Sequence, residues 1–337
     1  MSTIKVNAIE STSSGGVAAK VASINDGALS NRNLLHNSSF EVWQRGTSFS
    51  SGASGGNRYT ADRWSVPNRT RVAQSTDVPA GFKYAILLDR EQTGGTEPFT
   101  VSQGIEKDNI RFTGSYTLSF YAKSSDITTV NINVQDRTTV SEGGTSHSSI
   151  VTNQAVTITS SWARYTHTFT LSSIALSGTC LRISIGNTSA GTNDELLLTG
   201  IQLETGTVAT EIEKRSLGHE FQLCQRYCYR IQLQNGDYSG FVGIAQGDSD
   251  AAVVSTFPVP MRTEPTYTGS ATSCRFQAGN PSNTVNFNAL SIYRCPVQRP
   301  VAIVGLRDFD VGSMTAGQVL LLMAMANNGS MIFDAEL

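Results

Sequence analysis

Charged residues are scarce in this chain of 337 residues. Asp, Glu, Lys and Arg make up only 15% of the sequence, whereas a typical globular domain has roughly a quarter. The net charge of -2 gives no electrostatic field that would attract nucleic acid or an anionic membrane surface. Ser, Thr, Asn and Gly fill the polar positions instead, and these residues suit strands and turns. We therefore expect no nucleic-acid partner.

Cysteine and long apolar runs are also limited. The five Cys residues are odd in number and widely spaced, which argues against a secreted disulfide framework. The apolar run over residues 319–326 is far shorter than the roughly 20 residues that cross a bilayer. No charged and then apolar signal peptide opens the sequence. We therefore expect synthesis in a cytoplasm without a secretory route, and no membrane insertion.

Motifs for bond chemistry are missing as well. The four His residues are far apart, and none lies in a zinc-binding pattern. A nucleophile elbow and a phosphate-binding loop are also absent. A glycosidase needs two facing acids, and the acids in or next to predicted strands are Asp89, Glu91, Glu195 and Glu204. Nothing in the sequence selects a pair among them, so we expect no catalytic residue and no enzymatic activity.

Alternating polar and apolar residues dominate the middle of the chain. Residues 130–135 and 181–185 alternate with a period of two, which predicts strands with one wet and one buried face. Similar short strands, separated by Gly, Ser, Asn or Asp, recur from residue 34 to about residue 210. Such spacing predicts a jelly-roll β-sandwich. Strand patterns return after residue 231 and predict a second β domain.

One segment between these β regions has helical spacing. Its apolar side chains are spaced 4, 3, 4 and 3 residues apart, which predicts a helix over residues 212–231. The apolar stripe consists of Leu217, Phe221, Cys224, Cys228 and Ile231. It could form the seam of a trimer or pack on a neighbouring sheet, and the sequence favours neither. The two Cys side chains could hold a metal, but core packing explains them more simply.

Residues 1–33 contain no Phe, Tyr or Trp. Ile4 and Val6 alternate with polar residues and predict one short strand, and a Ser/Gly-rich joint follows. Because such a segment cannot bury a core of its own, we expect an attachment arm with Ile4, Val6 and Ile9 as its apolar contacts. The alternative is a flexible terminus without a partner.

Aromatic residues gather in the Gly/Ser-rich stretch that follows residue 40. They are Trp43, Phe49, Tyr59 and Trp64. Sugar sites commonly use an exposed ring as an apolar platform beside amides and hydroxyls. Trp43, Tyr59 and Trp64 are therefore the predicted ligand-binding residues. The alternative is that the two Trp side chains close the ends of the sandwich.

Several stretches resemble known families. Residues 33–41, Asn-Leu-Leu-His-Asn-Ser-Ser-Phe-Glu, resemble the opening strand of jelly-roll carbohydrate-binding modules. The stretches similar to bacteriophage tail-fibre proteins are residues 43–46, 59–64, 198–204, 211–227 and 258–266. Residues 4–9 resemble the start of marine phage and cyanophage fibres.

This resemblance implies a jelly roll, a helix and a distal β domain, usually assembled as a homotrimer. It implies binding to phage tail adaptor or nozzle proteins at one end and to a host cell-surface glycan at the other. Jelly-roll modules of this kind often hold a structural calcium between the first and last strands. Glu41 and, more loosely, Asp194 match that motif, and carboxylate oxygens suit calcium.

Together these observations predict a mostly β chain in three parts. We expect an attachment arm over residues 1–33, a carbohydrate-binding-like jelly roll over residues 34–211, and a helix plus a C-terminal β domain over residues 212–337. The predicted function is that of a virion tail fibre that contacts the host surface without catalysis. Two alternatives stay open: a purely structural tail or decoration protein without receptor binding, and a binding module associated with a carbohydrate-active enzyme.

Overall fold

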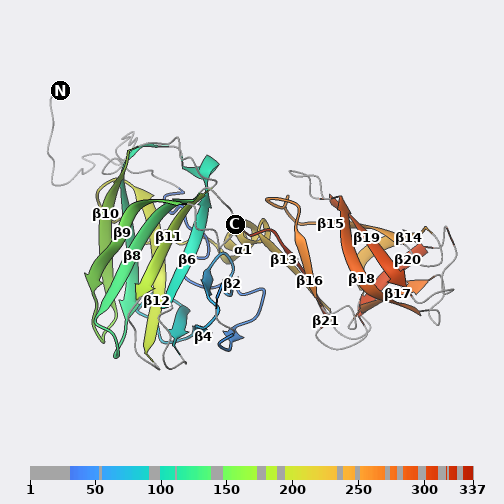
Figure 1. The fold of residues 1–337 in the computed structure, drawn as a ribbon, viewed down its shortest axis with the longest axis horizontal. Helices are drawn as coiled ribbons and strands as arrows, with labels where there is room; N and C mark the ends of the chain where they lie inside the picture. The colour runs from blue at the N-terminus through green and yellow to red at the C-terminus, as the bar shows by residue number, and fades with distance from the viewer. Residues whose placement is uncertain are drawn as a thin grey trace, which may run out of the picture.

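The computed structural model describes residues 31–52, 55–90, 99–110, 112–137, 147–172, 180–187, 194–233, 238–246, 251–269, 274–278, 284–294, 301–309, 316, 319–324 and 329–336. The predicted attachment residues Ile4, Val6 and Ile9 lie outside this part of the chain. The described residues form a β-sandwich, then one α-helix, then further β-sheets (Figure 1). This confirms the predicted fold class.

The sandwich consists of two six-stranded antiparallel sheets. The first has the order β1 (Ser48–Phe49), β4 (Arg71–Ser75), β5 (Ala85–Asp89), β12 (Glu195–Thr205), β7 (Gly114–Lys123) and β10 (Ala163–Leu171). The second has the order β2 (Asn57–Tyr59), β3 (Ser65–Pro67), β6 (Phe99–Glu106), β11 (Cys180–Asn187), β8 (Thr129–Arg137) and β9 (His147–Thr157). A short 3-10 helix, η1 (Lys107–Asn109), follows β6. Consecutive strands such as β5 and β6 lie in different sheets, as in a jelly roll.

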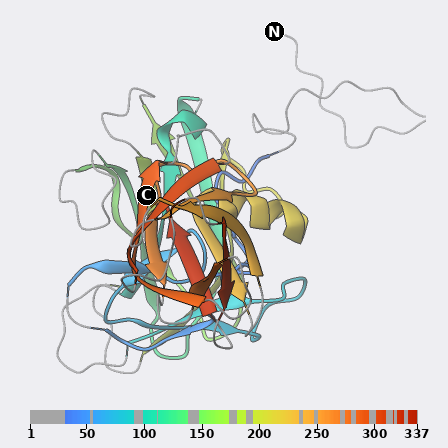
Figure 2. The same ribbon diagram turned by 90° about the vertical axis from the view of Figure 1, so that its right-hand side faces the viewer.

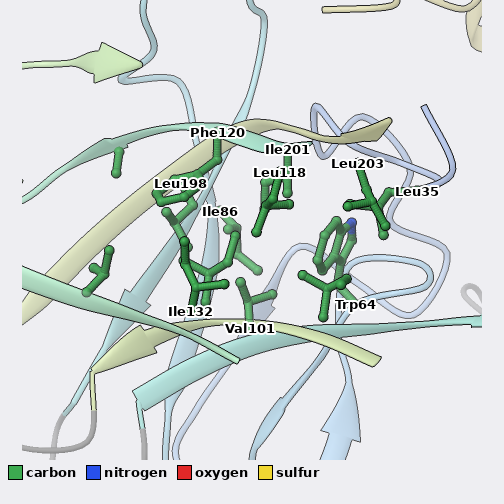
Figure 3. Packing of buried hydrophobic residues seen from close by; sticks show 14 of the residues in the cluster. Leu35, Trp64, Ile86, Val101, Leu118, Phe120, Ile132, Leu198, Ile201 and Leu203 are labelled. Atoms are coloured by element: carbon green, nitrogen blue, oxygen red, sulfur yellow. The ribbon is translucent and has the colours of Figure 1, made fainter. Parts of the chain in front are cut away.

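Along the strands, every second side chain points into the core between the two sheets. In β11, Leu181, Ile183 and Ile185 are fully buried, as the sequence predicts. Figure 3 shows the apolar side chains of both sheets meeting in one layer, with Trp64 at one end of it. Each large apolar side chain buried in this way contributes roughly 1.5–3 kcal/mol to stability.

The outer face of the first sheet is covered by the segment of residues 206–216, which leads from the sandwich to the helix. Glu204 Oε1 accepts a hydrogen bond from Thr210 N at 2.9 Å. Gln202 Oε1 accepts one from Glu213 N at 2.8 Å. These contacts explain why Gln202 and Glu204 are buried although they point away from the core.

The helix α1 (Leu217–Gln225) is shorter than the predicted helix. The Ser216 side chain caps it by accepting a hydrogen bond from His219 N at 3.3 Å. Cys228 already opens the strand β13 (Cys228–Leu233), so the prediction of a helix to residue 231 is wrong. Tyr229, Ile231 and Leu233 also alternate with polar residues, and pairing of this strand with a distant strand satisfies its backbone groups. Figure 2 shows α1 at the edge of the molecule.

Two β units follow the helix. A three-stranded sheet has the order β13, β21 (Gly329–Asp334) and β16 (Thr266–Gly269). A closed barrel consists of β14 (Tyr238–Ala245), β15 (Ala251–Thr256), β19 (Val301–Phe309), β18 (Thr284–Arg294), β17 (Cys274–Ala278) and β20 (Val319–Ala324). Figure 1 shows the small sheet between the sandwich and the barrel. Within the described residues, no helix has the length and apolar character to cross a bilayer.

Candidate functional site

A hollow of about 560 Å³ opens where the sandwich, α1 and β13 meet. Its lining consists of Glu41, Val42, Trp43, Gln44, Leu217, Gly218, Phe221, Arg230 and Gln232. The fold thus brings together residues that the sequence analysis assigned to three separate features. Trp43 comes from the predicted sugar platform, Phe221 from the predicted helix stripe and Glu41 from the predicted calcium site.

Trp43 is held by a local turn that leaves its indole ring half-buried. The indole Nε1 donates a hydrogen bond to the carbonyl oxygen of Phe40 at 2.6 Å. Phe40 has a left-handed backbone, with φ at 53°, and its ring packs against the buried Trp64 ring at 5.3 Å between centroids. The turn is therefore anchored in the core, and the indole is fixed at the wall of the hollow.

Two residues of the predicted helix stripe form the opposite apolar wall. Leu217 is 56% exposed and Phe221 is 38% exposed. Cys224 and Cys228 are instead completely buried within their own chain, and Ile231 is 9% exposed. The prediction of a trimer seam through all five residues is therefore wrong. Burial raises the pKa of both thiols, which keeps them protonated and suits packing rather than metal binding.

The polar floor of the hollow is fixed by Gln44. Its backbone N donates to Asp62 Oδ1 at 2.8 Å, and its side-chain amide donates to Asp62 Oδ2 and to the Cys228 carbonyl. The Gln44 side-chain oxygen accepts from Arg230 N at 3.1 Å, and the Gln44 carbonyl accepts from Arg230 Nη1 at 2.7 Å. Gln44 therefore fastens β13 to the sandwich and positions the Arg230 guanidinium at the rim.

Asp62 lies beneath this floor and is fully buried. Burial raises the pKa of Asp62 to about 6, while the Arg45 guanidinium and the hydrogen bonds from Gln44 act in the opposite direction. Arg45 Nη1 lies 3.9 Å from Asp62 Oδ1. The site therefore rests on a carboxyl group that titrates close to neutral pH.

Two of the predicted ligand residues do not belong to this hollow. Trp64 is 0% exposed, and its Nε1 donates to the Asn37 carbonyl at 2.9 Å, so its predicted role as a ligand platform is wrong. Its end-closing role, the alternative in the sequence analysis, explains its position. Tyr59 is half-buried beneath Arg45, whose Cζ lies 5.4 Å from the ring centroid.

The two residues matched to the calcium motif, Glu41 and Asp194, are near different parts of β12. Ser38, three residues before Glu41, accepts a hydrogen bond from Ile201 N at 3.0 Å, whereas Asp194 immediately precedes the strand. Seven residues of extended chain separate Asp194 from Ile201, which is about 23 Å. Calcium binding by Glu41 and Asp194 stays a prediction. Among the described residues, no group of three or more His, Cys, Asp or Glu side chains could hold a metal ion.

No protein-family model and no curated protein matches the sequence. Among solved structures, the chain is similar to the CBM22-1 xylan-binding domain of Xyn10C from Paenibacillus barcinonensis, with 18% identity, a TM-score of 0.33, and 47% of this chain and 100% of that domain covered. The C-terminal family 22 carbohydrate-binding module of Clostridium thermocellum Xyn10B gives 13% identity, a TM-score of 0.35, and 53% and 99% coverage. The enzymatically active domain of tailspike protein 4 from bacteriophage CBA120 gives 14% identity, a TM-score of 0.32, and 51% and 21% coverage. Similarities at this level concern the fold, and they do not identify a ligand.

Proposed function

We propose that this chain is a non-catalytic glycan-binding protein and that the hollow at Trp43 is its binding site. The observation that carries the proposal is the pairing of an exposed apolar wall, Trp43 with Phe221, and a polar rim that includes Arg230. The ring faces of sugars pack on aromatic side chains, while their hydroxyls need nearby donors and acceptors. The volume of about 560 Å³ suits a short saccharide, since small-molecule sites commonly span roughly 300–1,000 Å³.

We extend this proposal to the virion. The chain serves as a tail fibre of a bacterial virus, with residues 1–33 bound to tail adaptor or nozzle proteins and a host cell-surface glycan as its ligand. The order of fibre-like stretches over residues 43–46, 198–204 and 211–227 supports this role. The low charge of the chain supports it as well, because such a surface does not depend on salt bridges that a saline medium screens.

The same proposal includes a homotrimer, and the barrel supplies a surface for it. Val242, Ile244, Val254 and Val319 are 49%, 55%, 51% and 54% exposed. Val242 pairs with Val254 and Ile244 pairs with Val319 across neighbouring strands, so the four side chains form one continuous patch, the barrel patch. Exposed apolar patches mark association sites. Another copy of the chain carries the same uncharged patch, and contact between copies covers both without burying a charge. Three copies would also strengthen weak glycan binding through avidity.

The acidic residues support binding without hydrolysis. Among the described residues that line the hollow, Glu41 is the only Asp or Glu, whereas a glycosidase needs two acids across the scissile bond. Asp89 and Glu195 face each other across β5 and β12, as a facing pair of acids would. Asp89, however, is bound by Arg71, and neither acid lines the hollow. We therefore expect no release of reducing sugar ends from host polysaccharides.

Glycan-array screening followed by calorimetry with Trp43→Ala tests the binding site. Loss of a stacking ring costs about 1–2 kcal/mol, so we expect roughly a tenfold weaker affinity for the selected glycan. Trp162→Ala is the matched control, because Trp162 binds Asp77 through its Nε1 at 2.9 Å and does not line the hollow. Unchanged affinity in Trp43→Ala would place the glycan elsewhere. Failure of every host glycan would favour a purely structural virion protein, and hydrolysis of a bound glycan would favour the enzyme-associated alternative.

A further inference from the structure

A second hollow, of about 650 Å³, lies between the segment of residues 31–36, the start of β7 and α1. Three arginines from different parts of the chain line it, namely Arg32, Arg215 and Arg226. The described residues that line it include no Asp or Glu. In a chain with so few charged residues, this concentration of positive charge around one hollow is unusual.

Two of these arginines are held in place by hydrogen bonds and ion pairs with neighbouring groups of the chain. Arg215 Nη1 donates to the Leu35 carbonyl at 3.0 Å, and Arg215 Nη2 lies 3.2 Å from Glu213 Oε2. Arg226 Nε and Nη2 donate to the two carboxylate oxygens of Glu106, each at 3.1 Å. Arg32 Nη2 instead donates to a main-chain carbonyl, that of Glu211, at 3.2 Å. Arg32 is therefore the arginine best placed to offer its charge to a ligand.

The imidazole of His36 lines the same hollow and lies close to Arg215 and Arg226. Its Nδ1 is buried and has no hydrogen-bond partner among the described residues. Burial lowers the pKa of His36 well below its usual value, and the positive charges of neighbouring groups, including Arg215 and Arg226, lower it further. Arg63, Arg215, Arg226 and His219 all act on the His36 imidazole in this direction.

An aromatic ring stands at the same opening. Phe112 is 62% exposed, more than any other large apolar side chain of the described residues. Its carbonyl accepts a hydrogen bond from the Tyr116 hydroxyl at 2.6 Å, and Tyr116 is 1% exposed. The backbone beneath the ring is therefore anchored to the core, while the ring itself faces solvent.

We propose that this second hollow binds the acidic unit of an anionic saccharide, with the sugar carboxylate on the Arg32 guanidinium and the sugar ring against Phe112. A guanidinium matches the planar fork of a carboxylate, and an exposed ring matches the apolar face of a pyranose. The inference rests on the proposed glycan-binding function and names a ligand class for it. It also assigns that class to a site separate from Trp43.

Calorimetry with trigalacturonic acid and with maltotriose, a neutral trisaccharide, tests the proposal on the full chain. We expect trigalacturonic acid to bind, and Arg32→Gln and Phe112→Ala each to weaken it at least tenfold. Lys83→Gln removes one exposed positive charge away from the hollow and should leave the affinity unchanged. Trp162→Ala should also leave it unchanged, because Trp162 lines neither hollow. Raising the salt concentration from 50 to 500 mM should weaken the wild-type affinity several-fold, on the order expected for a partly exposed charge pair.

Four outcomes would overturn the inference. One is that trigalacturonic acid does not bind while neutral glycans still bind at Trp43, which leaves the proposed function intact. Another is that its binding depends on Trp43 and not on Phe112. A third is that sulfate or acetate binds as tightly as the sugar acid, which indicates an anion site without sugar recognition. The last is that no saccharide binds at all, in which case the proposed function fails too. Thermal unfolding of each variant verifies that the fold is kept.

Discussion

Arg45 in the sandwich and Asp334 at the end of β21 form an ion pair, with Arg45 Nη2 and Asp334 Oδ2 2.7 Å apart. Arg45 Nη1 also lies 3.4 Å from Glu336 Oε1, and Glu336 pairs with Arg63 as well. The side chains of Arg63 and Glu336 are only 1% and 3% exposed. The end of the chain is thus fastened to the sandwich through charges that are almost entirely removed from water.

Loss of Glu336 should destabilise this joint strongly. Removing one partner of a buried ion pair leaves the other charge uncompensated, which costs about 3–5 kcal/mol. We expect Glu336→Gln to lower the free energy of unfolding by about 3 kcal/mol, measured by chemical denaturation. Glu264→Gln, a change at an exposed residue, is the control and should have little effect. Equal stability of the two variants would contradict this account of the joint.

The raised pKa of Asp62 predicts a pH dependence of stability. Burial raises the pKa from 3.8 to about 6, so the native state binds a proton that the unfolded state has already lost between these values. The contribution of Asp62 to stability therefore increases as the pH falls from about 6 to about 4, by on the order of 3 kcal/mol. Denaturation between pH 4 and 7 should show this slope in the wild type and lose it in Asp62→Asn.

His36 acts in the opposite direction, which is why the comparison with Asp62→Asn is needed. Its lowered pKa means that the native state resists protonation, so its contribution to stability is lost as the pH falls below the usual value of 6.5. Because both chains retain His36, the difference between them isolates Asp62. An identical pH slope in the two chains would contradict the buried, partly neutral Asp62.

Gly200 should tolerate no side chain. It has φ at +58° beside a register shift in β12, and an added Cβ would lie 2.6 Å from Phe82 Cζ. We expect Gly200→Ala to lower the free energy of unfolding by about 2 kcal/mol. Gly218 in α1 is the matched control, because an added Cβ would meet nothing within 4 Å. Gly218→Ala should be neutral or stabilise by up to about 1 kcal/mol, and a similar loss in both variants would contradict the prediction.

The proposed homotrimer predicts a mass near three times 36.1 kDa by light scattering. Ile244→Lys places a charge in the barrel patch and should yield folded monomers, because the charge would be buried between copies. Thr170→Lys in β10 changes an equally exposed strand position on the sandwich and should leave the trimer intact. A trimer that survives Ile244→Lys would exclude the barrel patch as the contact. A monomeric wild type would remove the homotrimer from the proposal.

Local patterns explain which parts of the fold could be predicted. Apolar and polar side chains alternate over residues 181–185. This pattern fits a strand and not a helix, so the strand could be predicted from the sequence. Ile231 fits both the apolar stripe of a helix and a period of two with Tyr229 and Leu233, so the sequence could not place the end of the helix. The deciding partner, β21, begins about a hundred residues later and gives no local signal.

The candidate sites show the same limit. Trp43 and Trp64 occur in the same stretch, and nothing local distinguishes the half-exposed ring from the buried one. Both indoles donate to a main-chain carbonyl, Trp43 to that of Phe40 and Trp64 to that of Asn37, so the difference lies in where the fold places each ring. Phe112 was not among the residues predicted from the sequence. Its position as a single aromatic residue in a polar turn before a strand is the signal that could have identified it. Arg32 and Arg226 are almost two hundred residues apart, and only the fold brings them to one hollow.

The small sheet of β13, β16 and β21 connects the barrel to the rest of the chain. The chain passes from this sheet to the barrel after β13, returns for β16, leaves again for β17 and comes back from β20 to β21. The barrel is therefore held by four chain connections, and the last of them continues to the buried ion pairs of Glu336. Four connections resist bending of the barrel more than a single linker between two domains does. A lateral pull on the barrel would load several antiparallel strands of this sheet together and pass the force on to the sandwich.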